Sequence, residues 1–238
     1  MKARSIRRRF GFSWSSGTET LPQATARPSI SNGASGRGHA VTVEACPRPL
    51  PAGEIEGQTV ICGRVDVPDV HGKADSRRIG LAFAVPKAGT LSPATDPVVY
   101  LHGGPGGGAV KDLWSITVPI VDQFRGRRDL VTFDQRAAGI SSDMATCSDT
   151  PGVDTAALMA PGKVVPATPE ADLVSRCLEA IEAKNGDITA HNTTQNAHDT
   201  RALMRAPGHP EWNLYGISYA IQKALEVMRS APRARGRW

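Results

Sequence analysis

The stretch WNLYGISYA, residues 212–220, decides the fold predicted for this chain. A short apolar strand is expected from Trp212 to Tyr215, and the residues that follow, AIQKALEVMRS, have the apolar spacing of a helix. Ser218 therefore stands in a sharp strand-to-helix turn, which exposes its hydroxyl at a helix N-terminus where developing negative charge is favoured. The small residues that such a crowded turn needs are Gly216 and Ala220. The alternative is an ordinary turn serine, but the strand before it and the helix after it favour a nucleophile.

A glycine-rich run, His102-Gly-Gly-Pro-Gly-Gly-Gly108, follows the short apolar strand at residues 97–101. Acyl transfer creates an oxyanion, and glycines let backbone N–H groups approach it without side-chain obstruction. The candidate donors are Gly103 or Gly104, together with the N–H of Tyr219. A phosphate-binding loop is the rival interpretation, but G-K-[ST] is absent and Pro105 removes a donor. His102 is expected to order the loop by hydrogen bonding rather than to act as a base or metal ligand.

A third motif, FDQRAAGIS at residues 133–141, follows another apolar strand. The simplest expectation for an aspartate and an arginine at a strand end, here Asp134 and Arg136, is a local ion-paired turn with a structural role.

Apolar strands alternating with amphipathic helices predict an α/β protein with a doubly wound, mainly parallel sheet. Strands are expected within residues 58–68, 77–86, 97–101, 127–136 and 212–215, and helices at about 169–185, 196–204 and 220–230. In the last helix the apolar positions are Ile221, Ala224, Leu225 and Met228.

Composition sets the domain boundaries. Residues 1–40 are rich in Ser, Gly, Thr and Arg and are expected to be disordered, residues 41–230 to form one partial domain, and residues 231–238 to be a basic disordered tail. The net charge of +5 comes from the two ends, and residues 10–228 carry −4. We therefore predict no nucleic-acid partner.

No apolar run approaches the roughly 18 residues of a membrane span, and the basic start lacks the apolar region of a convincing signal peptide.

The four cysteines permit two local pairs, Cys46 with Cys62 and Cys147 with Cys177, although buried free thiols are an equal alternative. No C-x-x-C pair is present, so a zinc ribbon or a thioredoxin-like site lacks the close ligand spacing that it would need, and no metal and no cofactor is expected.

The order HGGPGGG, FDQRAAGISS, WNLYGISYA closely resembles the proline-iminopeptidase branch of the α/β-hydrolases, especially its secreted tripeptidyl-aminopeptidase-like members. The resemblance extends from about Cys46 to about Pro232 and includes AHNTTQNAHDTRALM, where His191 replaces a usual aromatic residue. Ala137 stands at the first glycine of the family's D-Q-R-G-x-G-x-S. The resemblance implies the N-terminal portion of an α/β-hydrolase fold, a serine peptidase that releases N-terminal residues, and a secreted or cell-envelope location with paired cysteines. Without a signal peptide, a cytoplasmic location is the alternative.

In this fold the triad acid and base follow the serine along the chain. After Ser218 the sequence holds one carboxylate side chain, Glu226, and no histidine. The later strands and the cap are also missing, so we expect a truncated chain that is inactive alone. An esterase acting on small esters is one alternative to a peptidase, and a non-catalytic remnant or binding module is another. The last strand would present an open sheet edge, which predicts poor solubility or self-association.

Overall fold

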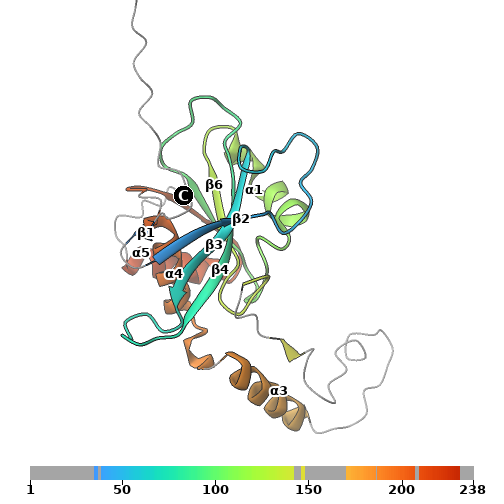
Figure 1. Ribbon diagram of the computed structural model, residues 1–238, viewed down its shortest axis with the longest axis vertical. Coiled ribbons are helices and arrows are strands. Elements are labelled where there is room, and N and C mark those ends of the chain that lie inside the picture. The colour runs from blue at the N-terminus through green and yellow to red at the C-terminus, as the bar shows by residue number, and fades with distance from the viewer. Residues whose placement is uncertain are drawn as a thin grey trace, which may run out of the picture.

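The computed structural model describes residues 35–36, 39–141, 146–147, 170–185, 187–206 and 209–230. They form a seven-stranded sheet in the order β1-β2-β3-β4-β6-β5-β7, with helices on its two faces (Figure 1). The strands are β1 (Ser35–Gly36), β2 (His39–Glu44), β3 (Val60–Pro68), β4 (Arg78–Pro86), β5 (Val98–Leu101), β6 (Leu130–Phe133) and β7 (Asn213–Gly216). The helices are the π-helical turn η1 (Leu113–Thr117), α1 (Val118–Arg125), α3 (Glu170–Asn185), the 3-10 turn η3 (Ile188–Ala190), α4 (Thr193–Arg205) and α5 (Ala220–Ser230).

The sheet is mixed, with its parallel part at the end that carries the motifs. β5 lies between β6 and β7 and pairs with both in parallel, with Val99 opposite Val131 and Leu214. The neighbouring pairs β1/β2, β2/β3, β3/β4 and β4/β6 are antiparallel. Among the described strands, β2 and β4 therefore run antiparallel to the other five.

Alternating side chains of the strands pack on opposite faces of the sheet. On β4, Leu81 and Phe83 join the core that contains α4 and α5, whereas Ala82 and Ala84 pack against η1 and the start of α1. In Figure 1, α1 lies on one side of the sheet and α4 and α5 on the other. This two-sided covering confirms the α/β, doubly wound class, because strands buried on both faces need helices on both.

The elements from residue 60 onwards agree with the sequence prediction better than those before it. All five expected strands and the helices α3, α4 and α5 are present. It missed β2, whose start at His39 lies inside the segment expected to be disordered, and it missed η1 and α1. Most of residues 1–40 and all of residues 231–238 lie outside the described residues.

Helix α5 has the expected bounds but not the expected buried face. Ile221 and Leu225 are exposed, whereas Lys223 is completely buried. The helix begins in the turn at Ser218, and Gly216 packs directly against Ala220. Which residues of α5 face the core depends on how the helix is oriented after this turn, and the apolar spacing did not predict it.

Two disulfides join the cysteines in the local order. Cys46 pairs with Cys62 on β3, with Cα atoms 5.1 Å apart, and Cys147 pairs with Cys177 on α3, with Cα atoms 5.2 Å apart. Helix α3 stands away from the layered body in Figure 1, and Val174 and Leu178 on it are exposed.

Candidate functional site

The three motifs meet at one edge of the sheet. β5, β6 and β7 are parallel neighbours, so their carboxyl ends lie at the same edge. The glycine-rich loop follows Leu101, the D-Q-R motif follows Phe133, and the Ser218 turn follows Gly216. The glycine-rich loop and the Ser218 turn, more than a hundred residues apart in the sequence, are thus brought to one edge by strand order and direction.

Ser218 has the backbone conformation of a strained turn. Its φ is 59°, in the left-handed region that non-glycine residues rarely adopt, and its side chain is exposed. The turn is as crowded as expected, because a methyl group at Gly216 would lie 2.9 Å from the Ala220 carbonyl oxygen. The neighbouring Tyr219 is anchored through its hydroxyl, 2.9 Å from Thr193 Oγ1 at the start of α4.

The glycine-rich loop lies directly against this turn. A methyl group at Gly103 would lie 2.8 Å from the Ile217 carbonyl oxygen and 3.1 Å from Ser218 Cβ. Any larger residue at Gly103 would push the two segments apart. Gly104 has a φ of 109°, and the Gly104–Pro105 peptide is cis.

His102 lies beneath the loop that it opens. Its Nδ1 is 3.0 Å from the Tyr100 hydroxyl, and a methyl group at Gly107 would overlap its ring. Burial, together with the nearby charge of Lys223, lowers the pKa of His102 below the usual range, which favours the neutral ring. These contacts fit the expected loop-ordering role.

Asp134 holds the same loop from the other side. Its carboxylate accepts hydrogen bonds from the backbone N–H groups of Val110 at 2.7 Å and Ile140 at 2.8 Å. Burial nevertheless raises the pKa of Asp134 above the usual range. The next residue, Gln135, is also buried, and its Nε2 donates to the carbonyl oxygens of His102 at 3.2 Å and Gly103 at 3.3 Å.

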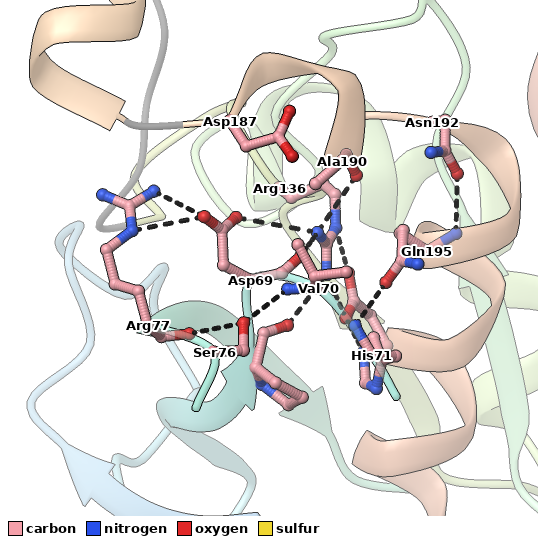
Figure 2. Close-up of polar contacts among 12 residues, drawn as sticks. Asp69, Val70, His71, Ser76, Arg77, Arg136, Asp187, Ala190, Asn192 and Gln195 are labelled. Carbon is pink, nitrogen blue, oxygen red and sulfur yellow. Dashed lines mark hydrogen bonds and ion pairs between the residues drawn. The ribbon is translucent and has the colours of Figure 1, made fainter. Parts of the chain in front are cut away.

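Arg136 does not form the local ion pair with Asp134 that the sequence suggested. Its guanidinium instead crosses to α4, where both oxygens of the buried Asp199 accept hydrogen bonds at 2.8 Å. It also donates to the carbonyl oxygens of Asp69 and Ala190, between which Figure 2 shows it. The local prediction was wrong because Asp134 is satisfied by backbone donors, which leaves Arg136 to join β6 to distant segments.

The same cluster binds the β3–β4 loop. His71 Nε2 lies 2.7 Å from Asp199 Oδ1. The backbone N–H of His71 donates to Gln195 Oε1 at 2.7 Å (Figure 2). Burial works to raise the pKa of Asp199, but the hydrogen bonds from His71 and Arg136 outweigh it and leave the pKa low. Asp199 therefore stays ionised at the centre of the cluster. The sequence carried no signal for this contact, because its members are far apart along the chain.

Lys223 is an unexpected member of the core beneath the site. Its side chain is 0% exposed, and Nζ has no hydrogen-bond partner among the described residues. The ammonium position lies 5.2 Å from the centre of the Phe133 ring. Burial lowers the pKa of Lys223 to about 7.

None of the six histidines hydrogen-bonds to Ser218 in the part of the chain that the structure describes. His71 lies between His39 and His198, with ring centres 6.0 and 5.2 Å away, beside Asp199. His209 precedes β7, at the opposite end of that strand from Ser218. The acid and base of a triad are thus not assembled at Ser218 by these residues.

A pocket of about 180 Å³ lies along β7 but does not include Ser218. Its lining residues are Val98, Phe124, Arg128, Asn213, Leu214 and Tyr215.

The described residues contain no group of three or more His, Cys, Asp or Glu side chains able to hold a metal ion. Among the helices in the described ranges, none has the length and apolar character needed to cross a membrane.

Comparisons with known proteins give a likeness of fold only. No protein-family model matches the chain, and no curated protein matches it. Solved structures similar to it include a proline iminopeptidase-related protein from Thermus thermophilus, with 19% identity, a TM-score of 0.38, and coverage of 82% of this chain and 42% of that one. A putative α/β-hydrolase from Nostoc has 17% identity and a TM-score of 0.36, with 72% and 40% covered. The epoxide hydrolase of Aspergillus niger has 15% identity and a TM-score of 0.37, with 72% and 32% covered.

The chain therefore spans about two fifths or less of the length of these three structures. At these identities and TM-scores the likeness carries no argument about activity or substrate.

Proposed function

We propose that this chain carries the nucleophile and the oxyanion-binding amides of a serine hydrolase, with Ser218 as the attacking residue. The observation that supports this most directly is the left-handed, exposed Ser218 packed against Gly103. A strained conformation of a non-glycine residue persists only where the surrounding structure imposes it, and such residues cluster at functional sites.

In the proposed reaction, Ser218 Oγ adds to the carbonyl carbon of a peptide or ester while its proton passes to a base. The carbonyl oxygen becomes an oxyanion, which the N–H of Tyr219 and that of Gly103 or Gly104 would bind. The carbon–nitrogen or carbon–oxygen bond then breaks, the amine or alcohol leaves with a proton, and water hydrolyses the acyl-enzyme.

The preferred substrate class is a peptide with a free N-terminus, and this part rests on the resemblance of the three motifs. A small ester is the near alternative, because the turn at Ser218 presents the same hydroxyl to an amide and to an ester. No base contacts Ser218 within the described residues, so we expect turnover by this chain to be reduced on the order of 10⁴- to 10⁶-fold relative to a complete triad.

A second candidate function is a binding module without turnover. The observation that favours it is the lack of a hydrogen-bonded histidine at Ser218 in the described part of the chain. The two candidates differ in whether Ser218 forms a covalent bond.

Labelling with a fluorophosphonate tests the proposal. We expect one adduct per folded chain, located on Ser218 by mass spectrometry and absent from Ser218→Ala. Ser115→Ala is the matched control, because Ser115 is also an exposed serine but lies on η1, outside the turn that holds Ser218. Because no base contacts Ser218 within the described residues, labelling is expected to be slow and is followed to completion. A folded protein that gives no adduct would contradict the proposed nucleophile and favour the binding module.

A further inference from the structure

The contacts of Gln135 have a geometric consequence for the two candidate oxyanion donors of the glycine-rich loop. Gln135 Nε2 donates to the carbonyl oxygens of His102 and Gly103. These carbonyls belong to the peptide planes that also contain the N–H groups of Gly103 and Gly104. One buried amide therefore contacts both planes from which the proposed donors project.

Peptide planarity fixes where those N–H groups point. In a trans peptide the C=O and N–H bonds lie in one plane and point in opposite directions. The His102–Gly103 and Gly103–Gly104 peptides are both trans. With each carbonyl directed at Gln135, the N–H groups of Gly103 and Gly104 are directed away from it.

The N–H groups that point away from Gln135 also lack hydrogen-bond acceptors among the described residues. Within the described residues, neither the Gly103 N–H nor the Gly104 N–H has a hydrogen-bond acceptor, and the same is true of the Tyr219 N–H. Gly103 lies against Ser218, so the unused donors are next to the exposed hydroxyl. In these peptide groups the carbonyl oxygens are held by hydrogen bonds while the N–H groups have no acceptor. This is the arrangement expected of a preorganised anion-binding loop.

We infer that Gln135 is a positioning residue, which aims the amides of Gly103 and Gly104 at the oxyanion by holding the carbonyls of their peptide planes. The inference rests on the proposed function of Ser218. Gln135 is 2% exposed and follows Asp134, whose carboxylate holds Val110 farther along the same loop. The two side chains together fix the loop at both ends.

Two substitutions separate this role from simple packing. Gln135→Met keeps the length of the side chain but removes the donor. Gln135→Glu keeps the shape, but an ionised carboxylate only accepts hydrogen bonds and repels the two carbonyls, whereas a protonated carboxyl regains one O–H donor. Gln123→Met, at an exposed position of α1, is the matched control.

The first measurement does not depend on catalysis. In ¹H–¹⁵N spectra of the full chain, Gln135→Met should shift the amide resonances of Gly103 and Gly104, while Gln123→Met leaves them unchanged. If a folded Gln135→Met protein retains the wild-type resonances at both glycines, the inference is overturned, whether or not Ser218 reacts.

The second measurement is the rate constant for fluorophosphonate labelling of Ser218. We expect Gln135→Met to lower it about 10- to 100-fold, as the loss of aligned oxyanion donors does elsewhere. Gln135→Glu should be slow at pH 8 and recover relative to wild type as the pH falls and its carboxyl becomes protonated. Such recovery would not follow from packing alone, and a Gln135→Glu protein without it would contradict the inference.

The outcomes for the two proposals are distinct. A wild-type protein that is never labelled would refute the proposed function, while the glycine resonances would still decide whether Gln135 holds the loop. If Gln135→Met does not fold, the spectra and the labelling of Gln135→Glu as a function of pH decide in its place.

Discussion

At the scale of single residues, the burial of Lys223 carries a free-energy cost. A buried amine without a partner is unfavourable in either state, and the charged state is the worse of the two. The amine is separated from solvent by the core that Phe133 and α4 build around it. Its pKa of about 7, compared with 10.5 for an ordinary lysine, expresses that cost.

Replacing this lysine by an apolar residue of similar length should therefore stabilise the protein. Between pH 7 and pH 10.5 the unfolded chain binds the proton that the folded chain has lost, so stability rises with pH across this window, and below it the full penalty remains. We expect Lys223→Met to raise the free energy of unfolding by roughly 2–5 kcal/mol at pH 6 and by less at pH 10. Urea unfolding at the two pH values measures this, and an equal or negative change at pH 6 would contradict it.

At the scale of elements, the turn after β6 contains a conformational conflict. Ala137 has a φ of 58°, where a side chain crowds the following carbonyl oxygen and glycine is preferred. Gly139, in the same turn, has a φ of 60°, and a methyl group there would overlap the Asp134 carboxylate. An alanine at position 137, where the sequences it resembles have glycine, therefore leaves the turn in place but strained.

Ala137→Gly should relieve this strain. We expect it to raise the free energy of unfolding by about 0.5–1 kcal/mol, since the gain in the left-handed region is partly offset by the greater freedom of the unfolded chain. Ala138→Gly, at the next position, whose φ is not positive, should destabilise instead. Thermal unfolding of both variants checks the pair, and a change of the same sign in both would argue against strain at Ala137.

The second feature at this scale is the connection that Arg136 makes between β6, α4 and the β3–β4 loop (Figure 2). Removing one partner of a buried ion pair leaves the other charge uncompensated. We expect Arg136→Met to lower the free energy of unfolding by about 3–5 kcal/mol, as measured by urea unfolding at pH 7.

Arg77 is the control for this prediction, because it also contacts the Asp69 carboxylate but its side chain is 42% exposed. Arg77→Met should cost at most about 1 kcal/mol. Asp199 has a lowered pKa, so its contribution is complete above the ordinary pKa of an aspartate and is lost as the pH falls through the folded value. A loss at Arg136 no greater than that at Arg77 would show that the cluster is not buried as described.

At the scale of the whole molecule, β7 is the end strand of the described sheet and pairs there only with β5. Ile217 in the turn that follows, and Ile221 and Leu225 on α5, are all exposed and spaced four residues apart. An open strand edge beside an exposed apolar stripe is a recognised route to association.

We predict concentration-dependent association of the chain, measured by analytical ultracentrifugation. Ile221→Lys combined with Leu225→Lys should weaken it, because a charged stripe resists burial. Leu91→Lys, which changes a fully exposed leucine in the β4–β5 loop, should have little effect. A wild-type chain that stays monomeric and melts sharply across the concentration range would contradict the prediction.

Local patterns were sufficient for the strands β3 to β7, for the helices α3, α4 and α5, and for the turn at Ser218. Apolar runs bounded by glycine and proline located β3 to β7, and the strand–serine–helix sequence located the strained turn, because these signals depend on neighbouring residues. The glycine-rich loop was also predictable from the sequence, since the conformational freedom of glycine is a property of the residue itself.

Only the tertiary structure decided which distant groups meet. Gln135 beneath His102 and Gly103, Arg136 on Asp199, and Lys223 inside the core all depend on how parallel strands end at one edge and how the turn at Ser218 rotates α5. No periodicity encodes such contacts, because hydrogen bonding and burial depend on separation in space, while a sequence pattern reports only separation along the chain.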